Sequence, residues 1–291
     1  MKTSREITGN SRVCGVIGDP IGHSISPAMH NAAFRALNLD YVYVPFRVSP
    51  ENLPHALEGI RALNIRGVNV TIPHKVSIIP LLDEIDGFAR EIGSVNVIVN
   101  DNGRLIGYNT DAPGFIHALQ HYGVELAGER VTVMGAGGAA RAICFALAER
   151  GTSVTILNRT PDNAARFAEE ISARTGQPIQ VMRLTQENLA EAMDSCNILV
   201  NATSVGMYPD VEAMLVDHTM IKSHQTVVDI VYNPPRTRLL AEAEKAGARI
   251  VGGMEMLVWQ GALAFEIWTG KQAPTEIMRK CAQHLLKSHE K

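Results

Sequence analysis

Short runs of β-branched and apolar residues alternate with segments whose apolar residues recur at helical spacing, from residue 13 onward. Alternation of this kind is typical of βα units that fold into largely parallel sheets. A chain of 291 residues is long enough for two domains. We therefore expect an α/β protein with two domains. Strands are predicted in the first part of the chain at VCGVIG, YVYVPFRV, GVNVTI and VNVIVN, and in the second at RVTVMG, TSVTIL, PIQVM, CNILVN and TVVDIV.

Capping and turn residues mark where helices begin and end. Ser26-Pro27 predicts the start of a helix, with the serine as its cap and the proline in its first turn. Asn102-Gly103 predicts a tight turn. The next helix should begin just after Asp111 and end at Gly123, and we place the domain connection there. Further helices are predicted at ENLPHALEGIRAL, ARAICFALAER, NAARFAEEISART, and at about 254–269 and 274–289.

The strongest local signal is the segment RVTVMGAGGAARAICFALAERG, in which a buried strand leads through a glycine turn into a helix. Gly135, Gly137 and Ala140 satisfy GxGxxA, a variant of the dinucleotide-binding fingerprint. The glycines permit a tight turn and a close approach of the pyrophosphate, and the positive end of the helix dipole favours phosphate. A plain strand-to-helix turn is the alternative. The strand, the helix and the following strand are all present, which favours a dinucleotide site.

The residues after the next strand indicate which dinucleotide binds. Asn158 and Arg159 stand where an NAD enzyme usually has an acidic residue for the ribose 2′-hydroxyl. An arginine near this position accommodates a 2′-phosphate instead, so the pair favours NADP. An exposed arginine without a ligand is the alternative, and Asp162 could bind a bare ribose, which keeps NAD open.

Polar side chains also lie in the loops of the first domain. Ser24 and Ser26 belong to the loop GDPIGHSISPAMHN, and their hydroxyls suit a polyhydroxylated or carboxylated ligand; Ser26 could also cap the helix. Lys75, Asn96 and Asp111 each lie at or just after the carboxyl end of a predicted strand, where open sheets bind ligands. A lysine beside a carboxylate could exchange a proton with a hydroxyl. A surface ion pair would use the same two residue types.

Composition and charge exclude other classes of function. The net charge is −3, without a basic tail, so no nucleic-acid partner is expected. The amino terminus lacks the apolar stretch of a secretion signal, and no run approaches the ~18 apolar residues of a membrane helix. The four cysteines include no CxxC pair, so we expect a cytoplasmic protein without a membrane partner. His117 and His121 have no apparent third ligand, so no metal is expected.

Together these motifs resemble the shikimate dehydrogenase family, including its quinate/shikimate branch. The resemblance covers nearly the whole chain, through GDPIGHSISPAMHN, NVTIPHK, SVN, GYNTD, GAGGAAR, NRT, NATSVGM, DIVYNP and GGMEMLVWQGA in that order. It implies reversible oxidation of the ring C3 hydroxyl of shikimate to 3-dehydroshikimate in aromatic amino acid biosynthesis, with hydride passing to NADP. The alternatives are a quinate or dual-cofactor dehydrogenase and a catalytically silent ligand sensor. The intact pair of Lys75 and Asp111 argues against a sensor.

The resemblance also implies roles for individual residues. Lys75 and Asp111 match the family's catalytic pair, in which the lysine accepts the hydroxyl proton and the aspartate bonds the same hydroxyl. The substrate would be bound by these two and by Ser24 and Ser26 at its carboxylate, by Thr71, Asn96 and Gln260 at its ring hydroxyls, and by Tyr232. The cofactor would be bound by Gly135, Ala136, Gly137, Gly138, Ala139, Asn158, Arg159, Thr160, Ile230 and Gly253.

A nested architecture follows from the same resemblance. Residues 1–111 would form a mostly parallel α/β substrate domain, completed by 252–291, and residues 112–251 a doubly wound Rossmann domain for NADP. The two closing helices would return to the first domain, and the active site would lie in the cleft between the domains. Three positions depart from the family pattern: Ala112-Pro113 after NTD, Asn163 where a second basic residue is usual, and Val97 in VNV. We expect a monomer or homodimer.

Overall fold

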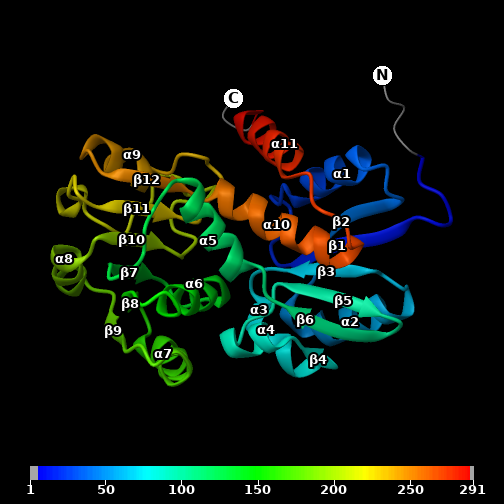
Figure 1. Ribbon diagram of the computed structural model, residues 1–291, viewed down its shortest axis with the longest axis horizontal. Coiled ribbons are helices and arrows are strands. Elements are labelled where there is room, and N and C mark those ends of the chain that lie inside the picture. The colour runs from blue at the N-terminus through cyan, green and yellow to red at the C-terminus, as the bar shows by residue number, and fades with distance from the viewer. Residues whose placement is uncertain (1–5, 289–291) are drawn as a thin grey trace. The chain divides into compact units, whose positions relative to one another are not determined.

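The computed structural model describes residues 6–288 (Figure 1). The chain divides into two compact units, Met1–Thr110 with Val258–Leu285, and Asp111–Leu257 with Leu286–Lys291. Each unit is built on a six-stranded sheet covered by helices. The expected two-domain α/β fold is therefore confirmed.

The sheet of the first unit is mixed, and three of its five strand pairings are parallel, in agreement with the mostly parallel sheet expected. Its strand order is β2-β1-β3-β5-β6-β4; β1 runs parallel to β2 and β3, whereas β5 runs antiparallel to β3 and β6. The predicted turn at Asn102-Gly103 joins β5 to β6 and reverses the direction of the chain between them. Both residues have positive φ, 52° and 92°, as a two-residue hairpin turn requires. The strands are β1 (Arg12–Gly18), β2 (Tyr41–Arg47), β3 (Gly67–Val70), β4 (Glu84–Ile85), β5 (Val97–Asp101) and β6 (Arg104–Tyr108).

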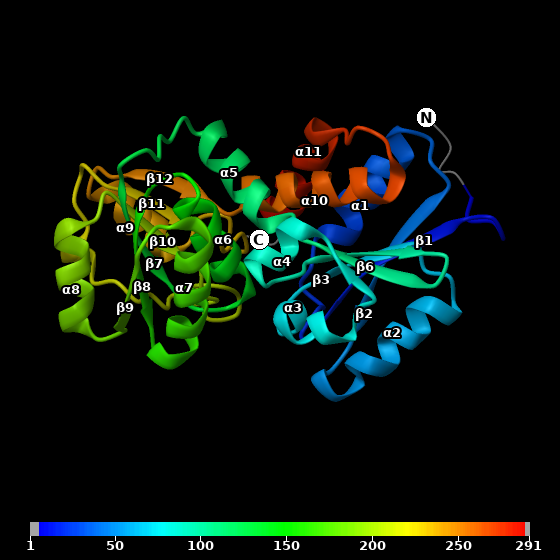
Figure 2. The same ribbon diagram turned by 60° about the horizontal axis from the view of Figure 1, so that its bottom comes forward.

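Helices cover both faces of this sheet, with α1 and α10 on one face and α2 on the other (Figure 2). The Phe34 ring of α1 stacks on Phe265 of α10, with 5.1 Å between centroids, and the Trp268 indole donates a hydrogen bond of 3.0 Å to the carbonyl of Ile98 in β5. The helices of this unit are α1 (Ser26–Ala36), α2 (Leu53–Ala62), α3 (His74–Ser77), α4 (Gly87–Ile92), most of α10 (Met254–Thr269) and α11 (Thr275–Ser288), with the 3-10 turns η1 (Pro50–Asn52) and η2 (Ile79–Leu81).

The two closing helices and their return to the first unit are confirmed. The predicted end of the last helix, at His289, lies outside the described residues. The predicted cap of α1 is wrong: Ser26 is the first helical residue, Ile25 precedes it, and no side chain caps the helix. The turn that leads into the helix includes one side-chain bond, in which Ser24 Oγ accepts the Ser26 N–H at 3.3 Å.

The sheet of the second unit is parallel throughout. Its order is β12-β11-β10-β7-β8-β9, so the chain winds outward in one direction from β7 and in the other from β10. This is the doubly wound arrangement expected, whose switch point lies between β7 and β10. The strands are β7 (Arg130–Met134), β8 (Ser153–Asn158), β9 (Ile179–Arg183), β10 (Ile198–Asn201), β11 (Thr226–Asp229) and β12 (Arg249–Gly252).

Apolar side chains from α8 and α9 form one core cluster with alternate residues of these strands, among them Met134, Leu157 and Leu199. Strand residues of the opposite parity, such as Val133, are also buried, because helices cover the other face. The helices of this unit are α5 (Asp111–His121), α6 (Gly138–Ala148), α7 (Pro161–Thr175), α8 (Gln186–Ser195) and α9 (Arg238–Lys245), with the 3-10 turn η3 (His218–Met220).

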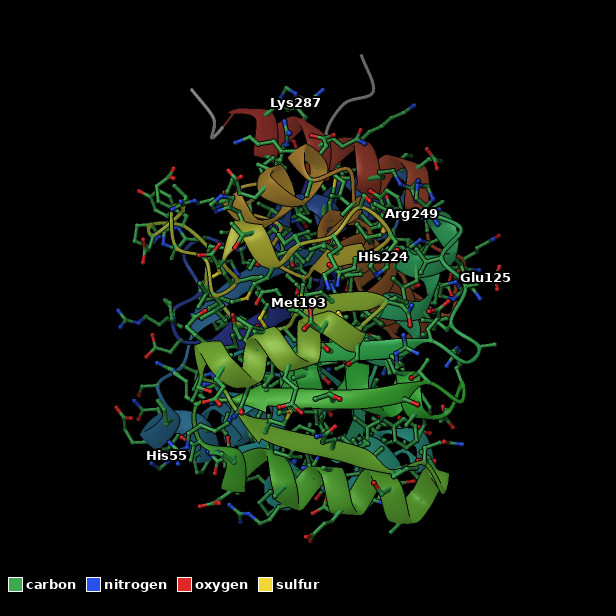
Figure 3. The ribbon with its side chains drawn as sticks, turned by 90° about the vertical axis from the view of Figure 1, so that its left-hand side faces the viewer. His55, Glu125, Met193, His224, Arg249 and Lys287 are labelled. Atoms are coloured by element: carbon green, nitrogen blue, oxygen red, sulfur yellow. The ribbon has the colours of Figure 1, made fainter. Side chains whose placement is uncertain are left out.

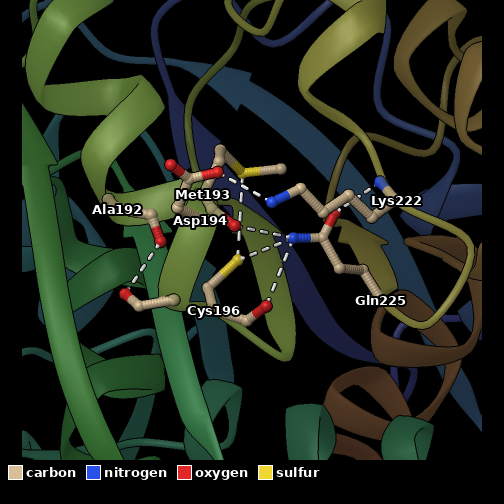
Figure 4. Close-up of polar contacts among 7 residues, drawn as sticks. Ala192, Met193, Asp194, Cys196, Lys222 and Gln225 are labelled. Carbon is tan, nitrogen blue, oxygen red and sulfur yellow. Dashed lines mark hydrogen bonds and ion pairs between the residues drawn. The ribbon is translucent and has the colours of Figure 1, made fainter.

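Polar contacts at the amino ends of the strands hold the helices to this sheet. The buried Gln225 side chain donates to the carbonyls of Met193 and Cys196, at 3.0 and 3.2 Å, and so joins α8 to the start of β11 (Figure 4). Met193 and Arg249 are labelled in Figure 3, where Arg249 starts β12 and donates 3.1 Å to the carbonyl of Gly123 after α5. These contacts lie at the amino ends of the strands, away from the carboxyl edge where ligands bind, so we assign them a structural role. Among residues 6–288, no helix is long and apolar enough to cross a membrane.

Candidate functional site

The glycine turn after β7 is shaped for close approach by a ligand. Gly135 has φ +110°, and a Cβ there would lie 2.9 Å from the carbonyl oxygen of Ala202, so no other residue fits without strain. Gly137 precedes α6 and is exposed, and a Cβ there would meet no atom within 4 Å. Open space therefore lies beside this residue, at the positive end of the helix dipole, as phosphate binding requires. Ala136, Gly138 and Ala139 are partly exposed in the same turn.

The end of β8 lies beside this turn, because β7 and β8 are parallel neighbours. Asn158 is half-buried and donates 2.9 Å to the carbonyl of Thr160, which shapes the turn into α7. Arg159 and Thr160 are exposed, and among residues 6–288 Arg159 forms no ion pair. A guanidinium at this edge is therefore open to an anionic ligand.

A third segment of the same edge follows β11. The N–H of Ile230 donates 3.1 Å to the carbonyl of Asn201 at the end of β10. A Cβ on Gly253 would lie 2.3 Å from the carbonyl oxygen of Ile230, so only glycine lets the backbone after β12 pack against this loop. Burial raises the pKa of the Tyr232 phenol, so this side chain stays protonated and can donate a hydrogen bond.

Asp229 fixes this loop from beneath and is fully buried. Its Oδ1 accepts the Val231 N–H and the Asn201 amide, both at 3.0 Å, and its Oδ2 accepts the Thr237 hydroxyl at 2.7 Å. Burial raises the pKa of Asp229 to about 6, against the three donors, which favour the charged form. The carboxylate thus joins the ends of β10 and β11 to the start of α9.

The substrate motifs of the first unit meet at one edge of its sheet. Ser24 lies in the loop between β1 and α1, Ser26 is the first residue of α1, and Thr71 follows β3, the neighbour of β1. The Thr71 N–H donates 3.0 Å to the carbonyl of Ile17. A Cβ on Gly18 would lie 2.4 Å from Thr71 Cγ2, so this glycine makes room for the threonine.

Lys75 is half-buried in the short helix α3, directly beyond this edge. Its carbonyl accepts the Val95 N–H at 2.8 Å, which fixes its backbone against the segment before β5. The preceding residue, His74, is fully buried, and its Nε2 lies 2.7 Å from the carbonyl oxygen of Val48. Asp111, the other member of the predicted pair, belongs to the second unit as the first residue of α5.

Asn96 reaches the same edge by a different route from the one expected. It does not follow the carboxyl end of a strand; it precedes β5, which is antiparallel to β3, so its amino end lies at this edge. The Val70 N–H donates 2.9 Å to the Asn96 carbonyl. The Asn96 side chain is buried and holds Thr110, with Oδ1 accepting the N–H at 2.7 Å and Nδ2 donating 3.0 Å to the hydroxyl.

Gln260 is half-buried on α10, which packs closely on α1. A Cβ on the next residue, Gly261, would lie 2.7 Å from Met29 Cε, so this glycine allows the close approach of the two helices. Because α1 begins at Ser26, the packing of α10 on α1 also holds the helix that follows Ser24 in place.

Comparison with known proteins shows to which family the chain belongs. Residues 16–98 match the shikimate dehydrogenase substrate binding domain, residues 117–238 match shikimate / quinate 5-dehydrogenase, and residues 253–282 match the shikimate 5′-dehydrogenase C-terminal domain. A protein of Dehalococcoides mccartyi named shikimate dehydrogenase (NADP(+)) is 46% identical over 95% of this chain and 97% of its own. The chain belongs to the shikimate dehydrogenase family.

Solved structures of shikimate dehydrogenases share the fold. One, in complex with NADP+, has a TM-score of 0.91 and 40% identity, covering 98% of this chain and 99% of its own. The Thermus thermophilus enzyme, in complex with NADP(H) and shikimate, has a TM-score of 0.84 and 40% identity, covering 94% and 99%. At these identities the likeness extends beyond the fold to the sequence motifs.

The predicted residues of this shikimate dehydrogenase family member thus fall into two groups. Ser24, Ser26, Thr71, Lys75 and Asn96 gather at one edge of the first sheet, and the predicted cofactor residues with Tyr232 gather at the carboxyl edge of the second. Sequence reasoning missed Asp229 and His74. A signal existed for both, since each is a titratable residue next to a strongly apolar run. Within residues 6–288, no three His, Cys, Asp or Glu side chains are grouped as metal ligands would be.

Proposed function

We propose that the chain is an NADP-dependent shikimate dehydrogenase, which reversibly oxidises the C3 hydroxyl of shikimate to 3-dehydroshikimate in aromatic amino acid biosynthesis. The identity to enzymes of this name over nearly the full chain supports the activity. The observation that carries the proposal is the gathering of Ser24, Thr71 and Lys75 at one sheet edge, in a chain whose second sheet presents an open glycine turn beside an exposed arginine.

The substrate would be held by hydroxyl, amide and phenol groups. Ser24 and Ser26 would bind its carboxylate, which hydroxyl donors at the start of a helix suit. Thr71, Asn96 and Gln260 would bind the ring hydroxyls, and Tyr232 would donate its phenolic hydrogen from the second unit. Hydroxyl and amide groups both donate and accept, so they match the hydroxyls of the substrate.

Lys75 and Asp111 would carry the proton chemistry. In the oxidation, the Lys75 amine accepts the proton of the C3 hydroxyl as the bond from C3 to hydrogen breaks, and in the reduction it returns that proton. Asp111 would accept a hydrogen bond from the same hydroxyl or from the ammonium and so orient both. Proton transfer would require both groups to be oriented on the same hydroxyl.

The residues at the edge of the second sheet fit a nicotinamide dinucleotide. Gly137 leaves space beside the start of α6 for a pyrophosphate, and Arg159 would pair with a 2′-phosphate. When bound, NADP supplies the acceptor of the hydride that leaves C3. Gly135 to Ala139, Asn158 to Thr160, Ile230 and Gly253 would orient it. Asn163, exposed in the first turn of α7, brings no second cation, so weaker use of NAD belongs to the proposal.

A matrix of two substrates and two cofactors tests the proposal. Steady-state rates would be measured with shikimate or quinate and with NADP+ or NAD+. We expect the highest kcat/KM for shikimate with NADP+. Turnover of quinate alone would reassign the substrate, and no turnover of either acid with either cofactor would refute the dehydrogenase.

The proposal also covers the cellular location and the oligomeric state of the protein. A cytoplasmic location is supported by the four free cysteines, of which Cys14, Cys144 and Cys196 are buried. We also propose a monomer or homodimer, which light scattering on the purified protein would distinguish from larger assemblies.

A further inference from the structure

The buried His74 has no part in the proton chemistry proposed above, although it directly precedes Lys75. None of its surface is exposed, and its Nε2 lies 2.7 Å from the Val48 carbonyl oxygen. A carbonyl only accepts, so Nε2 carries the hydrogen and donates it. Within residues 6–288, Nδ1 has no hydrogen-bond partner. Among the described residues, the His74 ring therefore makes one hydrogen bond, the one that its Nε2 donates to the Val48 carbonyl.

That bond spans three strands. Val48 follows β2, and its own N–H donates 3.1 Å to the carbonyl of Gly18 at the end of β1. The turn after β3 is tied to β1 through backbone bonds, from Thr71 N to Ile17 O and from Asp19 N to Ile72 O. Because the strand order is β2-β1-β3, the His74 ring adds the direct link from the β3 turn across to the end of β2.

The helix that carries Lys75 depends on such links. It has only four residues, His74–Ser77, and a single helical turn has no stability of its own. The His74 N–H donates 2.9 Å to the carbonyl of Thr71, and the Lys75 carbonyl accepts from Val95. The imidazole supplies a third anchor, made by a fully buried side chain.

We propose that His74 is a positioning residue, whose Nε2–H bond to the Val48 carbonyl holds the turn of Lys75 in the geometry needed for proton transfer. This inference rests on the proposed function. An apolar ring would fill the same space without burying an unpaired nitrogen, so the sequence keeps the costlier group. The need to orient Lys75 explains why a histidine stands here, since a small misplacement of a reacting group lowers the rate by about 10²-fold.

Two substitutions and a matched control test the proposal. His74→Phe keeps the ring and removes the donor, whereas His74→Gln restores a donor of similar reach. The control is Arg47→Ala: Arg47 Nε bonds Asp19 at 2.7 Å and so links β2 to the β1 loop at the same edge, but its side chain is 76% exposed. The kcat and KM for shikimate and NADP+ would be measured for each variant, with the circular dichroism spectrum as the check of folding.

We expect His74→Phe to lower kcat by about 10- to 100-fold with the KM for NADP+ unchanged. His74→Gln should recover at least a third of the lost rate on a logarithmic scale, and Arg47→Ala should stay within about twofold of the wild type. An unchanged kcat in His74→Phe, equal losses in His74→Phe and Arg47→Ala, or no recovery in His74→Gln would each overturn the proposal.

A measurement on the unmodified protein keeps the proposal testable if a variant does not fold. Nitrogen-15 NMR distinguishes the two neutral tautomers and the charged form of each of the ten histidines. His74 should carry a hydrogen on Nε2 that exchanges slowly with water. A hydrogen on Nδ1 instead would overturn the proposal. The wild-type rate with shikimate separates the two ideas, because its absence would refute the proposed function while this tautomer still decides the bond.

Discussion

Asp229 predicts how the stability of the protein should depend on pH. Burial raises the pKa of this carboxyl from an ordinary value of 3.8 to about 6, although three donors bind it. The folded protein therefore binds the proton more tightly than the unfolded chain does. The stabilisation by protonated Asp229 is fully present below pH 3.8 and is lost as pH rises through about 6.

The size of the effect follows from the pKa difference. Each pKa unit corresponds to about 1.4 kcal/mol, so a rise from 3.8 to about 6 is worth about 3 kcal/mol between the two pH limits. Asp229→Asn removes the titration and keeps the shape. Its Oδ1 can still accept from Val231 and Asn201, and its Nδ2 can donate to the Thr237 hydroxyl, so all three contacts survive.

Urea unfolding of the wild type and of Asp229→Asn, from pH 4 to pH 7.5, measures this contribution. The stability of the wild type relative to the variant should fall by about 2.4 kcal/mol across this range, because part of the full difference lies below pH 4. Asp210→Asn, at an exposed aspartate of the same unit, should show no such trend. If the wild type and Asp229→Asn give parallel curves, the carboxyl is ionised throughout and the three donors outweigh burial.

Three further substitutions test the site. Lys75→Ala should lower kcat by about 10²- to 10⁴-fold in steady-state assays, the usual worth of general acid–base catalysis, and an unchanged kcat would remove Lys75 from the mechanism. Arg159→Ala should raise the KM for NADP+ about 10- to 100-fold more than that for NAD+, because only NADP carries the 2′-phosphate; equal increases would leave the arginine a structural role. Gly253→Ala should destabilise the protein by about 1–3 kcal/mol in thermal unfolding, since its Cβ would lie 2.3 Å from a backbone oxygen. In the matched control Gly252→Ala the nearest atom is 3.5 Å away, and a similar loss there would contradict the steric argument.

The elements predicted from sequence are those with a long apolar pattern. The strands of the glycine-turn segment and both closing helices were predicted within a few residues, because burial on one or both faces leaves a clear pattern. Strands β4, β6 and β12 were missed. They are two to five residues long, and their pairing rather than their composition makes them strands.

The site residues divide in the same way. The glycine motif and the strand end before Lys75 marked these positions as candidates from the sequence, and the family resemblance supplied their expected roles. The contacts of His74 and Asp229 could not be predicted, because their partners Val48 and Thr237 are joined to them only by the fold. The predicted cap at Ser26 failed because the helix begins one residue earlier than the motif suggested, so that Ser26 is its first helical residue and Ile25 holds the cap position.

The two sheets also differ in whether strand direction alone predicts which residues reach the ligand-binding edge. In the second sheet every strand is parallel, so the residues that follow β7, β8 and β11 all lie at the carboxyl edge, where open sheets bind ligands. In the first sheet β5 runs antiparallel to β3, so Asn96 reaches the edge from the amino end of a strand, and the hairpin turn then reverses the chain into β6. The same hairpin returns the chain to that edge at Thr110, so that the buried amide of Asn96 holds the residue that precedes Asp111. The tight turn at Asn102-Gly103 therefore does more than connect two strands: it returns the chain to the edge where Asn96 lies, so that the buried Asn96 amide can bind both the N–H and the hydroxyl of Thr110.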